Sequence, residues 1–179
     1  MAARAEFARK GYDGASLRGI AREAGVDPAL LHHYFAGKAA LFAEALRLPV
    51  PPGALVTRLL DGPAHEAGRR MVSTFLSVWD DPSNTPRLAG LLRGAATHDH
   101  AARQIREFVA AETMIPVIRG LGDADDPSVP LRAGLAAAHV LGLAFMRYVL
   151  AHPPVADAPA NELAELMGPA LQTYLAPDA

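Results

Sequence analysis

The sequence predicts an all-α protein, with an N-terminal three-helix unit followed by a longer C-terminal helical bundle. Apolar residues recur every three or four positions in several segments, which is the spacing of one helix face. No segment alternates apolar and polar residues over the length of a strand, and β-branched residues are scattered. Proline and glycine divide the chain into segments of helix length. We therefore expect helices and no sheet.

The first unit covers residues 1–48 and begins with two predicted helices. The first spans residues 2–10 and ends at Gly11. Ser16 is placed to cap the second, over residues 17–24, because a serine oxygen accepts hydrogen bonds from the free amides of a first turn.

A tight turn and a third helix follow. Gly25 supplies a backbone conformation that a Cβ would oppose, so it marks the turn. Asp27 is expected to cap the third helix, and Pro28 fits its first position, where no amide donor is needed. The order of helix, glycine turn and short helix is that of a helix-turn-helix motif.

The third helix has an inner and an outer side. At about 100° per residue, Leu31 and Phe35 fall together and suit a core. Ala29, Leu30 and His33 then point outward. A major groove about 12 Å wide admits such a helix, whose first turn would reach base edges.

A boundary is expected near residue 48, and the second unit covers residues 49–179. Residues 49–53 are rich in proline, which lacks the amide donor and cannot continue a helix. Beyond them, apolar spacing predicts helices containing residues 71–79, 88–95, 105–115, 131–150 and 161–175.

Three further features of the second unit follow from its sequence. The segment 131–150 is apolar almost all round and is expected to be buried on every side. Pro116 and Pro169 should each kink or restart a helix. The acidic segment 122–127 is predicted to be a surface loop.

Composition excludes several classes of protein. The chain has no cysteine, which excludes disulfide scaffolds, thiolate zinc sites, iron–sulfur clusters and cysteine nucleophiles. We expect no apolar stretch long enough to cross a bilayer, and the start lacks a signal-peptide core, so we expect a cytoplasmic protein without a membrane partner.

The net charge of −2 is unevenly distributed. Residues 1–48 carry seven Lys or Arg against five Asp or Glu, and residues 49–179 carry ten against fourteen. The N-terminal unit is therefore the mildly basic part of the chain, and it is the part able to approach a polyanion.

Residues 11–26 (GYDGASLRGIAREAGV) and 31–42 (LHHYFAGKAALF) closely resemble the DNA-binding domain of tetracycline-repressor (TetR) type regulators. The resemblance covers about the first quarter of the chain. It implies a homodimer that binds a near-palindromic DNA operator, with a C-terminal domain that takes a small-molecule effector. It also implies that the last two helices form a four-helix bundle across the dimer axis, and that effector binding releases DNA.

Three departures from that pattern carry expectations of their own. The family usually has several residues before this start, so we expect that the first residues of the domain are missing. Gly19 stands where an acidic residue commonly completes the helix cap. Leu30 stands where a small hydroxyl residue commonly faces DNA, which favours an apolar contact such as one with a thymine methyl.

The predicted DNA contacts lie on both helices of the motif and just beyond it. Arg18 is the candidate for a base edge outside the third helix, and Lys38 is expected to contact a phosphate at the start of the next helix. Adjacent His32 and His33 point about 100° apart, so phosphate contact is favoured over a metal pair. The full set is Ser16, Arg18, Pro28, Ala29, Leu30, His32, His33, Tyr34 and Lys38.

Large apolar side chains of the second unit, with one histidine, are candidates for an effector pocket, although most of them must simply form the core. The candidates are Met71, Phe75, Trp79, Leu92, Phe108, Met114, His139 and Met146. Their apolar character favours a small apolar effector.

Small and large apolar residues at helical spacing predict a dimer interface between the two C-terminal helices, with packing inside one chain as the alternative. The candidates are Leu135, Ala138, Gly142, Phe145, Leu163, Met167, Leu171 and Tyr174.

Two other functions are alternatives to a DNA-binding regulator. His98 and His100 could bind a metal with an acidic partner in an enzyme, but Asp99 capping a helix is the favoured interpretation of that segment. The helix-turn-helix could instead serve a helical protein-interaction module. No cofactor and no catalytic residue is predicted.

Overall fold

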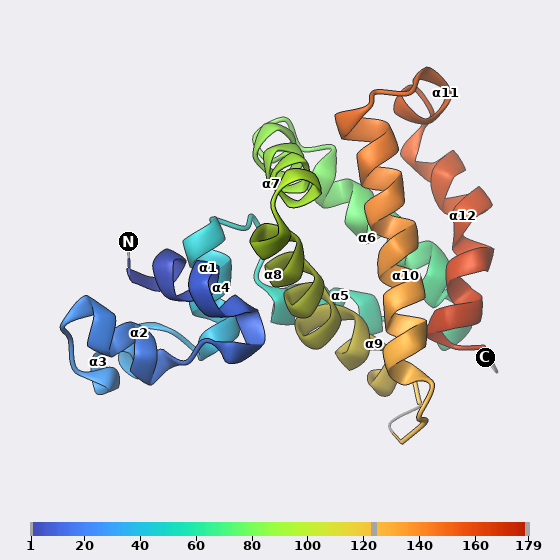
Figure 1. The fold of residues 1–179 in the computed structure, drawn as a ribbon. Coiled ribbons are helices and arrows are strands. Elements are labelled where there is room, and N and C mark those ends of the chain that lie inside the picture. Colours follow the sequence, from blue (N-terminus) through green and yellow to red (C-terminus); the bar gives the residue numbers. More distant parts are fainter. Residues whose placement is uncertain (1, 123–124, 178–179) are drawn as a thin grey trace.

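The computed structural model describes residues 2–122 and 125–177, and these residues form helices and no strand. The α-helices, shown in Figure 1, are α1 (Ala2–Gly14), α2 (Leu17–Ala24), α3 (Pro28–Tyr34), α4 (Lys38–Leu46), α5 (Pro52–Leu60), α6 (Ala67–Trp79), α7 (Thr85–Thr97), α8 (Asp99–Val109), α9 (Ile115–Gly120), α10 (Val129–Ala144), α11 (Pro153–Ala156) and α12 (Ala160–Leu175). A 3₁₀ turn, η1 (Ala64–Glu66), and two π-helical turns, η2 (Ala110–Met114) and η3 (Phe145–Val149), complete the described elements. The all-α prediction is confirmed.

Helices α1 to α4 form a unit that projects to one side of the remaining helices (Figure 1). Its core holds Phe7, Tyr12, Ile20 and Phe42, and Phe108 of α8 completes it. The N-terminal unit therefore does not close its core alone, because an aromatic ring from the second unit fills part of it.

The larger core lies among α5, α6, α9, α10 and α12. Helices α6 and α12 approach so closely that a Cβ on Gly68 would collide with the carbonyl oxygen of Gly168. The amide of Gly68 also donates to Oε1 of Gln172 at 2.9 Å. Glycine at position 68 is thus required by the backbone of the facing helix.

Pro116 restarts its helix as predicted, because the segment 105–115 ends in the π turn η2 and α9 begins at Ile115. Pro169 lies inside α12, which continues to Leu175. Helix α5 was not predicted from the sequence. It begins at Pro52, within the proline-rich residues 49–53 that mark the predicted boundary between the two units. Part of the predicted acidic loop, residues 123–124, lies outside the described residues.

The segment 131–150 differs from its prediction in two ways. Residues 129–149 form one helix that is long and apolar enough, by length and composition, to cross a membrane, so the judgement that no such stretch exists was wrong. The segment is also not buried on every side, because Leu131 is 68% exposed and Leu135 38% exposed. The opposite side, with Ala133, Ala136 and Val140, belongs to the protein core.

Candidate nucleic-acid interface and apolar pocket

The predicted caps of the helix-turn-helix are present. The Oγ of Ser16 accepts from the amide of Gly19 at 3.1 Å, and Oδ1 of Asp27 accepts from the amide of Ala29 at 2.8 Å. Gly25 ends α2 in the left-handed region with φ 68°. Pro28 is the first residue of α3. Short-range hydrogen bonds therefore fix the turn that presents α3.

Helix α3 separates its inner and outer sides as expected. Leu31 and Phe35 pack against the core of the N-terminal unit. On the outside, Leu30 is 47% exposed and Tyr34 is 73% exposed, with its ring 5.1 Å from that of His33. Ala29, His32 and His33 are exposed as well. The outer side of α3 is free to enter a groove.

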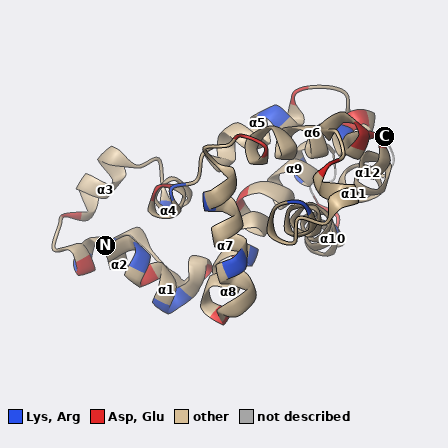
Figure 2. Cartoon of the chain, turned by 90° about the horizontal axis from the view of Figure 1, so that it is seen from above, with Lys and Arg blue, Asp and Glu red and all other residues tan. Residues whose placement is uncertain are grey.

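The charge near this surface comes from other helices. Helix α3 carries no Lys, Arg, Asp or Glu, as its tan ribbon in Figure 2 shows. Arg18 and Arg22 lie exposed on α2. The neighbouring helix α2 therefore supplies the guanidinium groups of the motif, and such groups are usual donors to phosphate.

Lys38 is the first residue of α4, as predicted, but its ammonium group also holds the end of α1. Nζ donates to the carbonyl oxygens of Tyr12 at 2.9 Å and Asp13 at 3.3 Å, and it lies 4.5 Å from the centre of the Tyr12 ring. These contacts were not predicted from the sequence, and the expected contact of Lys38 with a phosphate stays a prediction. Lys38 therefore ties the helix that follows α3 to the end of α1.

Tyr12 continues this connection into the second unit. Its hydroxyl donates to Oε1 of Glu112 at 2.5 Å, and its ring meets that of Phe108 at 5.3 Å. Burial and the Glu112 carboxylate raise the pKa of the Tyr12 hydroxyl, so it stays protonated as the donor. The π turn η2 places Glu112 toward Tyr12 while Thr113 and Met114 line a pocket.

Glu6 explains why glycine is accepted at position 19. The Glu6 side chain is fully buried, and its carboxylate lies where a Cβ on Gly19 would be, in the first turn of α2. It forms ion pairs with Arg9 and with Lys10. Hydrogen bonds from Lys10 and Arg9 lower the pKa of Glu6 against the opposing effect of burial. A residue of α1 thus supplies the negative charge that favours a helix N-terminus.

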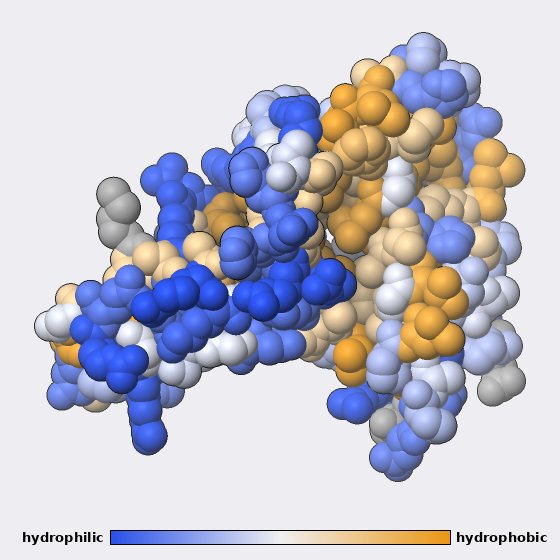
Figure 3. Space-filling model, viewed as in Figure 1, coloured by the Kyte–Doolittle hydropathy of each residue, from blue (hydrophilic) through white to orange (hydrophobic). Residues whose placement is uncertain are grey.

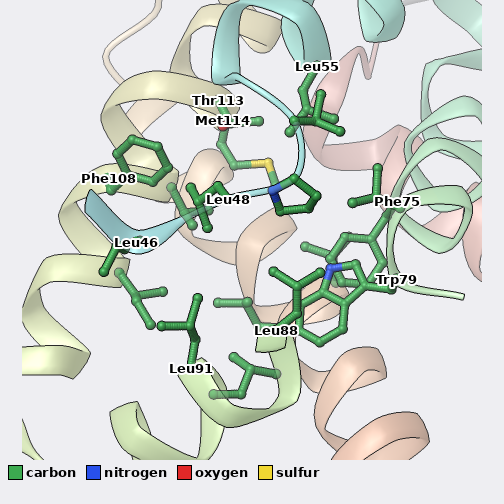
Figure 4. Close-up of a pocket in the computed structure, with 18 residues that line it drawn as sticks. Leu46, Leu48, Leu55, Phe75, Trp79, Leu88, Leu91, Phe108, Thr113 and Met114 are labelled. Atoms are coloured by element: carbon green, nitrogen blue, oxygen red, sulfur yellow. The ribbon is translucent and has the colours of Figure 1, made fainter. Parts of the chain in front are cut away.

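An apolar pocket of about 170 Å³ lies between the two units (Figure 4). Five predicted residues line it: Phe75, Trp79, Leu92, Phe108 and Met114. Three predicted residues do not. Met71 is only 3% exposed and belongs to the larger core. His139 contacts the carbonyl of Leu135 and the Tyr174 ring instead, and Met146 lies in η3 outside the lining.

One side of the pocket, formed by the end of α4 and the connection between the two units, was not predicted from the sequence. Leu46, Leu48, Pro49 and Val50 all line the pocket. It also missed residues that belong to α5 through α10: Leu55, Val78, Leu88, Leu91, Ile105, Val109, Thr113, Val140 and Leu141. Helical spacing places Leu88, Leu91 and Ile105 on the apolar sides of predicted helices. Spacing within one helix does not indicate which helices surround a common cavity.

Helices α10 and α12 present an apolar stripe to the solvent, which appears in orange over α10 in Figure 3. Of the predicted interface residues, Leu135, Ala138 and Gly142 are exposed on α10. Phe145, Leu163, Met167 and Tyr174 are half-buried. Leu171 is 0% exposed within the larger core, so its assignment to an interface was wrong. The two most exposed leucines of α10 and α12, Leu131 at 68% and Leu166 at 73%, were not among the named candidates.

Two regions of the chain match family models. Residues 1–45 match "Bacterial regulatory proteins, tetR family", and residues 65–175 match "Tetracyclin repressor-like, C-terminal domain". The chain belongs to the TetR family of transcriptional regulators. The helix-turn-helix described above is therefore the DNA-binding element of a TetR-family protein.

Individual proteins agree with this assignment. The TetR-family chain is 36% identical to a TetR-family regulator from Streptomyces coelicolor A3 of known crystal structure. That comparison covers 97% of this chain and 90% of the other, with a TM-score of 0.54. The chain is also 25% identical over 139 residues to the HTH-type transcriptional regulator BetI of Vibrio parahaemolyticus. This match covers 66% of this chain and 70% of that protein.

The TetR family is a class of regulators and not of enzymes. His98 and His100 lie at the start of α8, and no group of three His, Cys, Asp or Glu able to hold a metal forms within residues 2–122 and 125–177. His98 is the residue before α8, and Asp99 is the first helical residue, one position later than the predicted cap. The metal-enzyme alternative therefore gains no support from the geometry.

Proposed function

We propose that this TetR-family chain is a cytoplasmic, homodimeric repressor that binds a near-palindromic operator and is released by a small apolar effector. The predicted division into residues 1–48 for DNA and 49–179 for effector and dimer is part of the proposal. One observation carries the ligand response: the pocket wall includes Leu48, Pro49 and Val50, the segment that joins α4 to α5. A molecule in the pocket therefore touches the connection that positions the DNA-binding unit.

DNA recognition is assigned to the outer side of α3 and to its flanks. Leu30 and Ala29 would meet base edges, while Arg18 reaches a base or phosphate from α2. Ser16, Pro28, His32, His33, Tyr34 and Lys38 complete the proposed set. In a dimer, two copies of α3 would enter successive major grooves about 34–36 Å apart.

Homodimerisation is supported by the exposed stripe of α10 and α12. Leu131, Leu135, Ala138 and Gly142 follow one another at intervals of four, three and four residues, as in helices that pack side by side. Large apolar side chains such as Leu131 and Leu166 lie open to solvent in one chain. A second copy of the stripe would cover them.

Selection of bound sequences from random duplexes tests this proposal. We expect a near-palindromic site, and affinity that falls steeply with salt because counterions are released. Arg18→Ala should relax the preference at one position of each half-site, whereas Arg58→Ala, an exposed arginine of α5, should leave it unchanged. Recovery of no enriched sequence at low salt would refute DNA recognition by this surface.

Light scattering on a sizing column tests the dimer. Wild-type protein should elute as a dimer at micromolar concentration. Leu135→Glu should shift it toward monomer, because a carboxylate would be buried in the stripe, and Thr57→Glu on the exposed side of α5 is the matched control. A monomeric wild type would refute the dimer.

A further inference from the structure

The lining of the pocket is almost free of polar groups. Its eighteen residues include no Asp, Glu, Lys, Arg or His, and Thr113 supplies the single side-chain hydroxyl. A charged molecule that entered would lose its hydration and find no counter-charge. The pocket therefore selects against carboxylates, phosphates and ammonium groups.

Aromatic rings stand on two sides of the space. Phe75 and Trp79 stack with ring centres 5.2 Å apart, and Phe108 lies on the opposite side (Figure 4). Tyr148 stacks on Trp79 from outside the pocket, also at 5.2 Å, and holds the indole in place. Flat rings bind favourably against such walls by stacking or by edge contacts.

Met114 strengthens the preference for an aromatic guest. Its sulfur points into the space between the aromatic walls (Figure 4). Thioether sulfur makes favourable contacts with the edges of aromatic rings. A saturated ring of equal size would gain the burial but lose these contacts.

The volume indicates how large a group the pocket can bury. A protein cavity of about 150 Å³ lined by aliphatic and aromatic side chains accommodates benzene. The pocket of about 170 Å³ is close to that size. One ring with a small substituent fits, and the hydroxyl of Thr113 can donate to or accept from one polar atom.

We infer that the pocket takes uncharged single-ring aromatic molecules carrying one hydroxyl or carbonyl group. That such a molecule is the effector rests on the proposed function. Trp79 is the single tryptophan of the chain, so intrinsic fluorescence reports the pocket directly.

Four probes of similar size separate the contributions: p-cresol, benzoate, benzylammonium and cyclohexanol. Titration calorimetry and Trp79 fluorescence should show p-cresol binding at least tenfold more tightly than benzoate or benzylammonium, with cyclohexanol in between. Binding of either ion as tight as that of p-cresol, or no binding by p-cresol, would overturn the inference.

Two threonine variants test the hydroxyl. Thr113→Val keeps the shape of the side chain and should reduce the preference for p-cresol over toluene several-fold. Thr57→Val is the control, since Thr57 lies on α5 outside the pocket lining and its hydroxyl donates to the carbonyl of Gly53. An unchanged preference in Thr113→Val would overturn the role of Thr113.

A separate measurement distinguishes this inference from the proposed function. DNA affinity is measured with each probe on a duplex obtained by the selection above. Probe binding without a change in DNA affinity would support the ligand class and refute the ligand response. Release of DNA by benzoate but not by p-cresol would support a ligand response and refute the ligand class.

Discussion

The two aromatic clusters of this regulator are packed to different degrees. In the closed cluster, defined by Phe7, Tyr12, Phe42 and Phe108, every ring is at most 6% exposed and neighbouring rings lie 4.6–6.1 Å apart. In the open cluster, defined by Phe75, Trp79 and Tyr148, Phe75 and Trp79 line one side of a pocket and Tyr148 stacks on Trp79 from outside it.

The closed cluster connects the two units, whereas the open cluster borders the proposed binding site. Close packing in the closed cluster resists deformation, so α1, α4 and α8 are held together where the two units meet. The open cluster leaves space that a guest can fill. Phe108 belongs to the closed cluster and also lines the pocket, and it therefore connects the two.

Truncation of one ring should give the largest contrast. Phe42→Ala is expected to lower the free energy of unfolding by about 3–5 kcal/mol, because a fully buried ring is lost. Phe75→Ala should cost less, because this ring is half-buried beside an existing space. Urea denaturation measures both. Equal losses would contradict the distinction between the clusters.

Enlargement should have opposite signs in the two regions. Ile20→Phe adds volume to the core around the closed cluster, where Ile20 is 2% exposed, and should lower stability by about 1–3 kcal/mol. Leu92→Phe extends into the pocket and should raise stability by about 0.5–2 kcal/mol, as cavity-filling substitutions commonly do. It should also abolish binding of p-cresol. A loss of stability in Leu92→Phe comparable to that in Ile20→Phe would show that the pocket is not open space.

Removal of one hydroxyl tests the connection between the units. Tyr12→Phe should cost about 0.5–1.5 kcal/mol through the lost bond to Glu112. Tyr148→Phe is the matched control within the second unit, where the hydroxyl donates to Oδ1 of Asp80 at 2.7 Å. Both variants should unfold at similar urea concentrations. The change in DNA affinity caused by an effector should be reduced in Tyr12→Phe and unchanged in Tyr148→Phe.

The smallest expected effect is the pH dependence contributed by Glu6. Its pKa in the folded protein is lowered, so ionised Glu6 stabilises the fold above its ordinary value of 4.5. This contribution is lost as pH falls from about 5 through the lowered pKa. Glu6→Gln should therefore be less stable than wild type at pH 7, and the difference should shrink as the pH falls below about 4.5 toward the lowered pKa of Glu6. A constant difference across that range, measured by urea unfolding, would contradict the assignment.

Local features of the DNA-binding unit could be predicted well. The caps by Ser16 and Asp27 and the turn at Gly25 depend on residues within three positions of one another, so their spacing in the sequence identifies them. The inner and outer sides of α3 follow from helical periodicity. The acid that faces Gly19 could not be found in this way, because Glu6 arrives from another helix.

The predictions of the interface and the pocket show what helical periodicity cannot determine. Helix α10 has no polar side to mark its exposed face, and Leu171 lies among apolar neighbours on α12 that face both core and solvent. Periodicity identifies an apolar side, but the packing of neighbouring helices decides which part of it is covered. Leu171 was misassigned for this reason, and Leu131 and Leu166 were not among the named candidates.

The sequence by itself determined the helical class, the helix-turn-helix and the resemblance to TetR regulators, because these depend on short-range hydrogen bonds and on residue spacing. Only the tertiary structure decided that Lys38 holds Tyr12, that Tyr12 meets Glu112, and that the segment 48–50 borders a cavity. These contacts join residues up to 100 positions apart, and they depend on how the helices pack against one another.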